Sequence, residues 1–236
     1  LYLKMKKKKY LIIAAHPDDE TLGCGATIYN LRKEKKNVRV IFLGEGSTCR
    51  FKSGTKKKIL DKVIEKRKKY SINALKTLKI KDYFYYNLPC GKFDQVPILK
   101  IGKIIENEIS KFKPNIILTH SDTDVHVDHQ RTFQAALQAT RPSTNFNVEM
   151  LLSFEILSAT EKNFTKEFLP NYFIQISKNC LEKKLKAMKC YKSEIAKHPF
   201  SRSTNNIKNL AMLRGSQSGN YYAEAFKIIR LIEKKT

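Results

Sequence analysis

Two short segments of this chain gather side chains that bind metal ions or move protons. Residues 16–20 read His-Pro-Asp-Asp-Glu, which puts one imidazole and three carboxyl groups within five residues. Residues 122–129 read Asp-Thr-Asp-Val-His-Val-Asp-His. A catalytic metal usually takes about three protein ligands and keeps a position open for water. Imidazole and carboxylate groups at this density predict a metal-dependent hydrolase whose site is built from both segments.

Each segment follows an apolar run that is typical of a buried strand. Residues 10–13 precede the first segment and residues 116–118 precede the second. Chemistry in α/β proteins gathers where loops leave the carboxyl ends of the strands. We therefore expect the two segments to meet at one edge of a sheet.

The spacing within the segments suggests a division of roles. His16 and Asp19 are three residues apart and can turn toward one point, which leaves Asp18 beside the bound water. His126 and His129 have i, i+3 spacing, so both lie on one face if they open a helix. One of them can then ligate the metal while the other faces the substrate.

Asp124 and Asp128 are available to receive an imidazole N–H and so fix the tautomer of a ligand. A set of two histidines and one carboxylate also serves non-haem iron, so Fe²⁺ is an alternative to Zn²⁺. An oxygenase, however, would not need a further carboxylate beside the water. His120 ends a predicted strand, and its simplest role is to satisfy a backbone group.

The rest of the chain alternates between strand-like and helix-like segments. This alternation predicts an α/β fold in which helices flank a mostly parallel sheet. We expect strands at 10–15, 38–43, 83–87, 115–120, 148–156 and 172–176, and helices at 25–36, 56–78, 98–112, 126–140, 181–196, 204–213 and 222–234.

Length and composition favour a single soluble domain over residues 1–236. Hydrophobic residues make up 42% of the chain, and no apolar stretch approaches the roughly 20 residues that span a bilayer.

The five cysteines form no Cys-x-x-Cys pair and are odd in number. Free thiols of this kind are typical of a cytoplasmic protein. We expect Cys24, beside the first segment, to be a small buried residue.

The formal net charge of +24 requires an explanation. Nucleic acid or an anionic membrane surface would be a suitable partner for such a chain. Lysine-rich runs at residues 33–36 and 66–69 nevertheless lie in helical patterns with acidic residues interspersed, and no aromatic platform accompanies them. A compositional bias on solvated helix faces is therefore favoured, and nucleic-acid binding is the less favoured alternative.

The two motifs resemble the signatures of the LmbE-like, PIG-L de-N-acetylases. The likeness extends to Gly-Glu-Gly at residues 44–46, to Arg67 and to residues 222–226, so it covers nearly the whole chain. This family implies a Rossmann-like sheet and the zinc-dependent hydrolysis of an acetamide on an aminosugar.

The resemblance also implies roles for individual residues. By motif position, His16, Asp19 and His129 bind zinc and Asp18 is the general base. His126 stabilises the oxyanion, a role that suits a protonated imidazole held by a carboxylate.

The substrate end is the part of the chain with the weakest signal. Arg67, His198 and Arg202 are candidates to bind substrate, and Arg202 suits a phosphate or carboxylate. Surface positions are the alternative for the last two. The loop at residues 44–46 departs from the Thr-x-Gly pattern of many relatives and is a candidate sugar contact. We expect Glu224 to pair with a cation in a structural role.

These observations together predict a cytoplasmic, zinc-dependent N-deacetylase. Its substrate would be a small N-acetylated aminosugar conjugate such as a glycolipid, a sugar nucleotide or a glycoside. Peripheral contact with an anionic membrane and homo-oligomerisation are both compatible with the sequence. The alternatives are a metal-dependent amidohydrolase acting on a non-sugar amide and, from another class, a basic nucleic-acid-binding protein.

Overall fold

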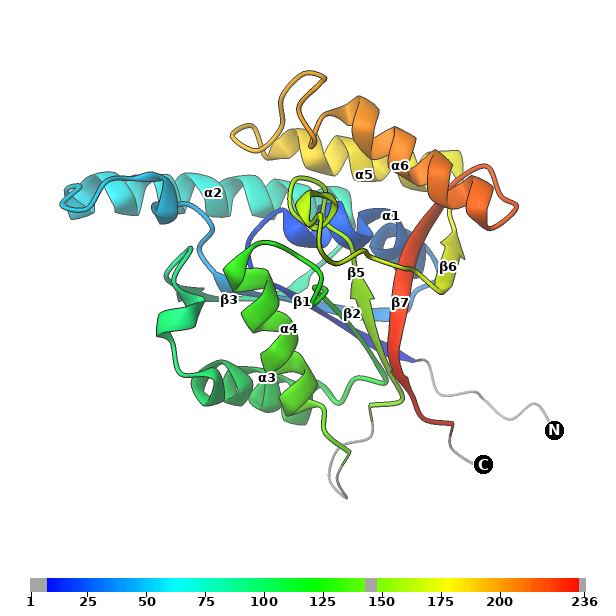
Figure 1. The fold of residues 1–236 in the computed structure, drawn as a ribbon, viewed down its shortest axis with the longest axis horizontal. Coiled ribbons are helices and arrows are strands. Elements are labelled where there is room, and N and C mark those ends of the chain that lie inside the picture. Colours follow the sequence, from blue (N-terminus) through cyan, green and yellow to red (C-terminus); the bar gives the residue numbers. More distant parts are fainter. Residues whose placement is uncertain (1–7, 143–147, 234–236) are drawn as a thin grey trace.

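The strands form one seven-stranded sheet with the order β3-β2-β1-β4-β5-β7-β6 (Figure 1). The computed structural model describes residues 8–142 and 148–233. The first five strands in this order run parallel, and β7 pairs antiparallel with both β5 and β6. The strands are β1 (Lys9–Ala14), β2 (Asn37–Gly44), β3 (Asp82–Leu88), β4 (Ile116–Thr119), β5 (Met150–Phe154), β6 (Tyr172–Gln175) and β7 (Ala223–Leu231). The predicted α/β fold with a mostly parallel sheet is confirmed.

Helices cover both faces of the sheet (Figure 1). Four of them, α1, α2, α5 and α6, lie on one face, and α3 and α4 lie on the other. Their bounds are α1 (Asp19–Lys33), α2 (Lys57–Thr77), α3 (Ile98–Phe112), α4 (Val127–Ala139), α5 (Lys178–Cys190) and α6 (Thr204–Gln217). None of these helices is long and apolar enough to cross a membrane.

The first strand shows how the sequence specifies this layered arrangement. Leu11 and Ile13 are fully buried in the core beneath α3 and α4. Ile12 and Ala14 are fully buried in the core on the opposite face. A strand that is covered on both faces needs a continuous apolar run, because successive side chains point to opposite sides.

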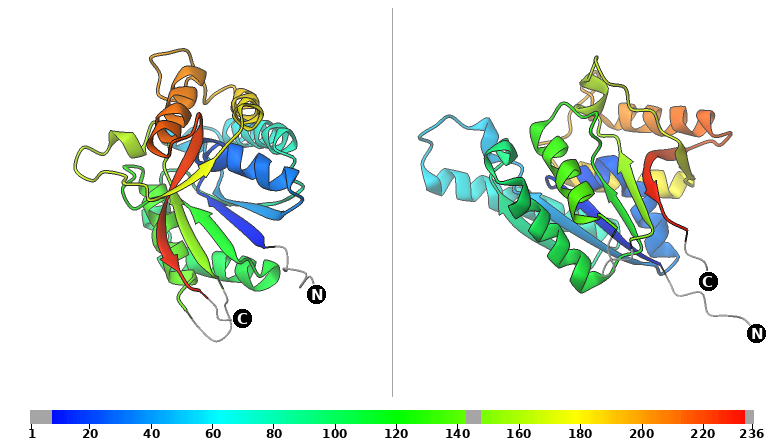
Figure 2. Two further views of the ribbon diagram at one scale, coloured as in Figure 1. Left: turned by 90° about the vertical axis from the view of Figure 1, so that its right-hand side faces the viewer. Right: turned by 60° about the horizontal axis from the view of Figure 1, so that its bottom comes forward.

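The last predicted helix, 222–234, is wrong. Residues 223–231 form the strand β7 instead, which lies between β5 and β6 at the end of the sheet (red in Figure 2). Alanine and glutamate at its start favour a helix locally. Pairing on both sides and burial of Ala223 to Phe226 override that preference, since strand formation depends on neighbours that sequence windows do not contain.

The first helix also differs from the prediction. It begins at Asp19 and not at residue 25, so part of the first motif lies in its opening turn. A kink at Cys24, with φ −151° and ψ 27°, divides the helix in two. Cys24 is buried as expected. The sequence pattern detected only the second, more apolar part of the helix.

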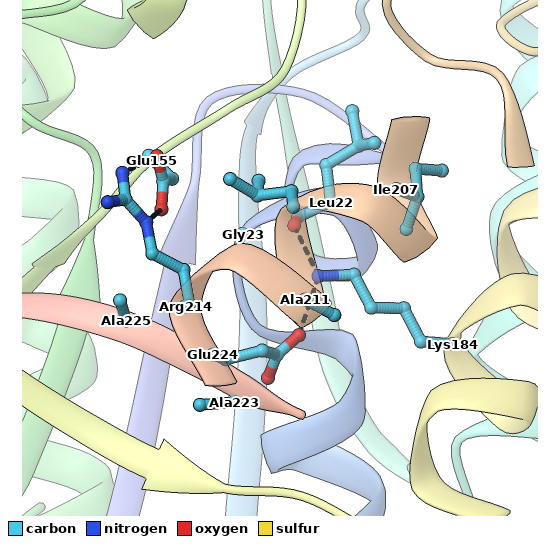
Figure 3. Close-up of a pocket in the computed structure, with 11 residues that line it drawn as sticks. Leu22, Gly23, Glu155, Lys184, Ile207, Ala211, Arg214, Ala223, Glu224 and Ala225 are labelled. Carbon is cyan, nitrogen blue, oxygen red and sulfur yellow. Dashed lines mark hydrogen bonds and ion pairs between the residues drawn. The ribbon is translucent and has the colours of Figure 1, made fainter. Parts of the chain in front are cut away.

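A buried ion pair supports this kink. Glu224 of β7 accepts the backbone N–H groups of Ala26 at 3.1 Å and Thr27 at 2.6 Å, which open the second part of α1. The ammonium group of Lys184 from α5 donates to Glu224 Oε1 at 2.6 Å and to the carbonyl of Leu22 at 2.7 Å (Figure 3). The expected structural pairing of Glu224 with a cation is therefore confirmed, and it joins three elements behind the first motif.

The strand order places the two motifs together. The chain proceeds from β1 to β2 and β3 on one side of the sheet, and from β4 to β5 on the other. The order therefore reverses between the neighbours β1 and β4, and ligand sites of open α/β sheets lie at such a switch point. The loops that leave β1 and β4, with the first turns of α1 and α4 that follow them, carry residues 16–20 and 120–129.

Candidate metal centre

His16, Asp19 and His129 converge at this switch point. Asp19 Oδ2 lies 3.6 Å from His16 Nδ1 and 3.4 Å from His129 Nε2. One ligand atom from each of the three residues lies within 4.8 Å of the other two. All three residues are buried. The structure thus brings together the three side chains that were predicted to hold a metal.

Two aspartates behind these ligands fix the imidazole rings. Asp128 Oδ2 lies 2.8 Å from His16 Nε2, and Asp124 Oδ2 lies 2.9 Å from His129 Nδ1. Each carboxylate accepts the outer N–H of its histidine and leaves the other ring nitrogen facing Asp19. Such partners orient a ligating imidazole and raise its basicity. The predicted supporting roles of Asp124 and Asp128 agree with this geometry.

The charge of the cluster suits a cation. Three buried carboxyl groups, those of Asp19, Asp124 and Asp128, surround the histidine rings. Burial disfavours the charged imidazole, but Asp19 and Asp124 outweigh burial and raise the pKa of His129 well above its usual value. Buried charges are stable only when they are paired or coordinate a metal. Nitrogen and oxygen donors in this number fit Zn²⁺ with a position left open.

His126 is held differently from the sequence-based expectation. Its Nδ1 accepts the backbone N–H of Asp128 at 3.2 Å, so the ring caps α4 instead of donating to a carboxylate. Burial and the neighbouring rings of His129 and His16 lower the pKa of His126 to about 4. The predicted protonated imidazole is therefore corrected to a neutral ring whose Nε2–H is the free donor.

His120 lies directly behind the cluster. Its Nε2 accepts the backbone N–H of Ala15 at 2.9 Å, the backbone role that the sequence suggested. The same atom lies 3.3 Å from Asp19 Oδ2, and the ring stacks on His129 with 4.0 Å between centroids. His120 therefore packs against Asp19 and His129 from the interior of the protein.

Asp18 occupies an unusual backbone conformation between two arginines. Its φ of 123° is one that residues with a side chain rarely adopt, and such strain gathers at active sites. Oδ1 lies 2.9 Å from Arg67 Nη2, and Oδ2 lies 3.0 Å from Arg202 Nη1. Burial, opposed by Arg67, raises the pKa of Asp18 to about 6.

Arg67 is largely occupied by contacts with the protein, the first of them its ion pair with Asp18. Besides Asp18, its guanidinium donates to the carbonyl of Pro17 at 2.8 Å and pairs with Glu194. The side chain is 5% exposed and its donors are directed at the protein. Because Arg67 also lines the cavity beside the cluster, its predicted role in binding substrate stays a prediction.

Glu194 is a functional residue that the sequence analysis missed. Its fully buried carboxylate pairs with Arg67, accepts from both terminal nitrogens of Arg50 at 2.6 Å, and accepts from Arg202 at 2.9 Å. One carboxylate thereby orients the two arginines that hold Asp18. Glu194 follows the end of α5 in an ordinary Lys-Ser-Glu-Ile stretch, and no local signal marks it.

Glu194 should give the protein a pH-dependent stability. Burial opposes the charged form, but the three guanidinium groups outweigh it and lower the pKa of Glu194 from 4.5 to about 2. A carboxyl whose pKa is lower in the folded state stabilises the fold above the unfolded value, and this contribution disappears as the pH falls from about 4.5 toward 2. Glu194→Gln should lower the unfolding free energy at pH 7 by at most about 3 kcal/mol, with a smaller deficit at pH 3.

Urea unfolding of the wild type and the variant at both pH values measures this difference. Glu182→Gln on α5 is the matched control, since Glu182 is exposed. A deficit that is equal at pH 3 and pH 7 would show that the charge of Glu194 is not responsible.

A cavity of about 360 Å³ opens onto the cluster, within the usual range for small-molecule sites. His198 does not line it and is exposed, so its predicted place at the substrate end is not supported. Glu45 does not line it either, because its carboxylate accepts backbone N–H groups from Ser47, Thr48 and Cys90. The lining includes Asp18, Asp19, Leu22, Gly46, Cys49, Arg50, Arg67, Cys90, His16, His126, His129, Phe200 and Arg202.

Comparisons with known proteins agree with this geometry. The sequence model of the GlcNAc-PI de-N-acetylase (PIG-L) family matches residues 11–140. Diacetylchitobiose deacetylase of Thermococcus kodakarensis is 26% identical over 230 residues, which are 94% of this chain and 83% of that protein. N,N'-diacetylchitobiose deacetylase from Pyrococcus horikoshii shares the fold, with a TM-score of 0.75 and 21% identity over 95% of this chain and 84% of that one.

The fold by itself does not define the reaction. GalB, the 4-carboxy-2-hydroxymuconate hydratase of Pseudomonas putida, also has a TM-score of 0.75, with 19% identity over 97% of this chain and 100% of its own. Assignment of this chain therefore depends on its sequence and its site. The family match spans more than half of the 236 residues and contains both motifs and all three candidate ligands. On this evidence the chain belongs to the GlcNAc-PI de-N-acetylase (PIG-L) family.

Proposed function

We propose that this protein is a zinc-dependent hydrolase that removes the N-acetyl group from an aminosugar conjugate. The observation that carries the proposal is the convergence of three donors, His16, Asp19 and His129, on a cavity that Asp18 also lines. A metal-ligand triad with an adjacent carboxylate suits metal-dependent amide hydrolysis, because it offers a site for an activated water and a base beside it.

The side chains divide the work of the reaction. A zinc ion bound by the triad would polarise water and lower its pKa toward about 7. Asp18 accepts the proton of the attacking water and returns it to the departing amine. Arg67 and Arg202 hold the Asp18 carboxylate in place. His126 lines the cavity, and its Nε2–H donates to the acetamide oxygen as that oxygen gains negative charge.

An aminosugar is the substrate class that the cavity and the relatives favour. Phe200 lies at the cavity, 40% exposed, with the Arg202 guanidinium 5.3 Å from its ring centroid. An aromatic ring beside polar donors suits a ligand with one apolar face and several hydroxyl groups. Diacetylchitobiose, which a relative deacetylates by name, is a ligand of this kind.

Acetate release is the measurement that tests the proposed reaction. The metal-loaded protein should release acetate from N-acetylglucosamine conjugates, and a chelator should abolish the release. Release from simple non-sugar acetamides at an equal rate would instead favour the broader amidohydrolase. Binding of nucleic acid that falls steeply with salt and survives His16→Ala, without any acetate release, would favour the alternative from another class.

Two histidine variants separate metal binding from catalysis. His129→Ala removes a ligand and should lower zinc affinity by more than the 10–100-fold typical of a lost supporting residue. His126→Ala should keep zinc and lower kcat by about 10²–10³-fold, the usual effect of losing one oxyanion donor. Zinc content by elemental analysis and acetate release together measure both effects.

The two variants act as controls for one another because His126 caps α4 and His129 lies in its first turn. Equal loss of zinc in both variants would make His126 a ligand and contradict its role as the oxyanion donor. Retention of zinc by His129→Ala would contradict the ligand set.

A further inference from the structure

Two cysteines face one another on the wall of the cavity. Cys49 lies in the short helical turn Thr48–Arg50 after β2, and Cys90 lies in the loop after β3. Their Sγ atoms are 2.8 Å apart, and the Cys90 thiol donates to Cys49. Both line the cavity that opens onto the metal cluster, yet neither has a role in the proposed hydrolysis.

The two loops that carry these thiols are held close to one another. The Glu45 carboxylate accepts the N–H groups of Thr48 at 3.1 Å and Cys90 at 3.0 Å, so one side chain anchors both loops. Gly91 has φ +71°, and a Cβ at this position would lie 2.9 Å from Cys49 Cβ. The close approach of the two loops is therefore built into their conformation.

The remaining cysteines lack such a partner in the structure. Cys24 and Cys180 are buried, and their sulfur contacts are with oxygen atoms of Glu20, Ser177 and Asn30. Cys190 is partly exposed, and its thiol donates to the carbonyl of Lys186. Among the contacts of the described residues, Cys49 and Cys90 form the one thiol–thiol pair.

The two members of the pair suit different steps of thiol oxidation. Cys49 is exposed and therefore open to an oxidant, whereas Cys90 is buried behind it. The hydrogen bond from Cys90, together with the nearby Arg50 guanidinium, lowers the pKa of Cys49 despite partial burial. A thiolate is the nucleophilic form, and an accessible thiolate beside a second thiol is the usual arrangement for disulfide formation.

We propose that Cys49 and Cys90 are a modification site at which hydrogen peroxide oxidises the pair to an intramolecular disulfide. The Cys49 thiolate attacks the peroxide, an S–O bond forms, the O–O bond breaks, and the leaving oxygen takes a proton to become water. Cys90 then attacks Cys49 Sγ, which forms the S–S bond and breaks the S–O bond. The second water carries away the Cys90 proton, so two thiols and one hydrogen peroxide give one disulfide and two waters.

Peptide mapping of the metal-loaded protein after stoichiometric hydrogen peroxide tests this site without measuring activity. Free thiols are then blocked with an alkylating agent before digestion. We expect a linked peptide containing Cys49 and Cys90, three alkylated cysteines out of five, and the release of two further thiols on reduction with dithiothreitol. Five free thiols after peroxide treatment would overturn the proposal.

Single substitutions identify the roles of the two sulfurs. In Cys90→Ser, Cys49 should stop at the sulfenic acid, which a sulfenate-specific probe captures. In Cys49→Ser, the buried Cys90 should remain a free thiol. Cys190→Ser is the matched control and should form the same disulfide as the wild type. Oxidation of Cys190 before Cys49, or capture of a sulfenate on Cys49 in the wild type without any linked peptide, would also overturn the proposal.

Discussion

Replacement of Asp18 by asparagine is expected to lower kcat by about 10²–10⁴-fold, the contribution typical of a general base. Asparagine has nearly the same shape but accepts no proton from water. The ion pairs of Asp18 with Arg67 and Arg202 show that the carboxylate is held in one orientation at the cavity. The three metal donors remain in the variant, so zinc content should stay at the wild-type level.

Acetate release at saturating substrate, with zinc analysis of the same sample, measures both quantities. Asp61→Asn is the matched control, because Asp61 lies exposed on α2, and it should leave kcat unchanged. Near-full activity of Asp18→Asn with zinc bound would refute the assignment of the base.

Replacement of Glu224 by glutamine is expected to lower the unfolding free energy by about 3–5 kcal/mol. The side chains of Lys184 and Glu224 are 6% and 4% exposed, so the variant leaves an ammonium group buried without its counter-charge. Domains have only about 5–15 kcal/mol of stability in total. The variant should therefore unfold at a distinctly lower urea concentration, without a direct effect on the metal ligands.

The double variant Lys184→Met/Glu224→Gln separates charge from hydrogen bonding. Methionine removes the buried cation, and glutamine still offers an oxygen to the N–H groups at the kink of α1, so much of the lost stability should return. Glu106→Gln on the exposed pair with Lys103, whose ammonium side chain is 72% exposed, should change stability by less than about 1 kcal/mol. A double variant as unstable as Glu224→Gln alone would show that the unpaired charge is not the cause.

The parts of the site that the sequence predicted are those determined by short-range pattern. The two motifs, with His16 and Asp19 in the first and residues 122–129 in the second, follow strands whose apolar runs are evident. The switch point between the neighbouring strands β1 and β4 then brings the two motifs together. The helix start at Asp19 was missed because a kink at Cys24 interrupts the amphipathic pattern. A short sequence window does not reveal the β7 strand, because its neighbours β6 and β5 lie about 50 and about 70 to 80 residues earlier in the chain.

The residues that sequence reasoning missed act through contacts between distant elements. Glu194 reaches Arg67 across more than 100 positions and Arg50 across 144. Glu20 belongs to the first motif, and its buried carboxyl accepts the Asp18 N–H at 3.0 Å and the Tyr191 hydroxyl at 2.7 Å. No local sequence pattern links a carboxylate in one segment to a guanidinium in a distant one. Their contact therefore becomes evident only in the folded structure.

Asp128 links the wall of the cavity to the metal ligands. Its Oδ2 accepts the Gly91 N–H at 2.6 Å as well as His16 Nε2, and its Oδ1 accepts the Phe93 N–H at 3.0 Å. The loop after β3 and the imidazole of a ligand therefore share one carboxylate. Divergence of this loop toward a new substrate would also move the carboxylate that holds the His16 ring, so the evolution of specificity on this wall is constrained by the need to keep the proposed metal ligands in place.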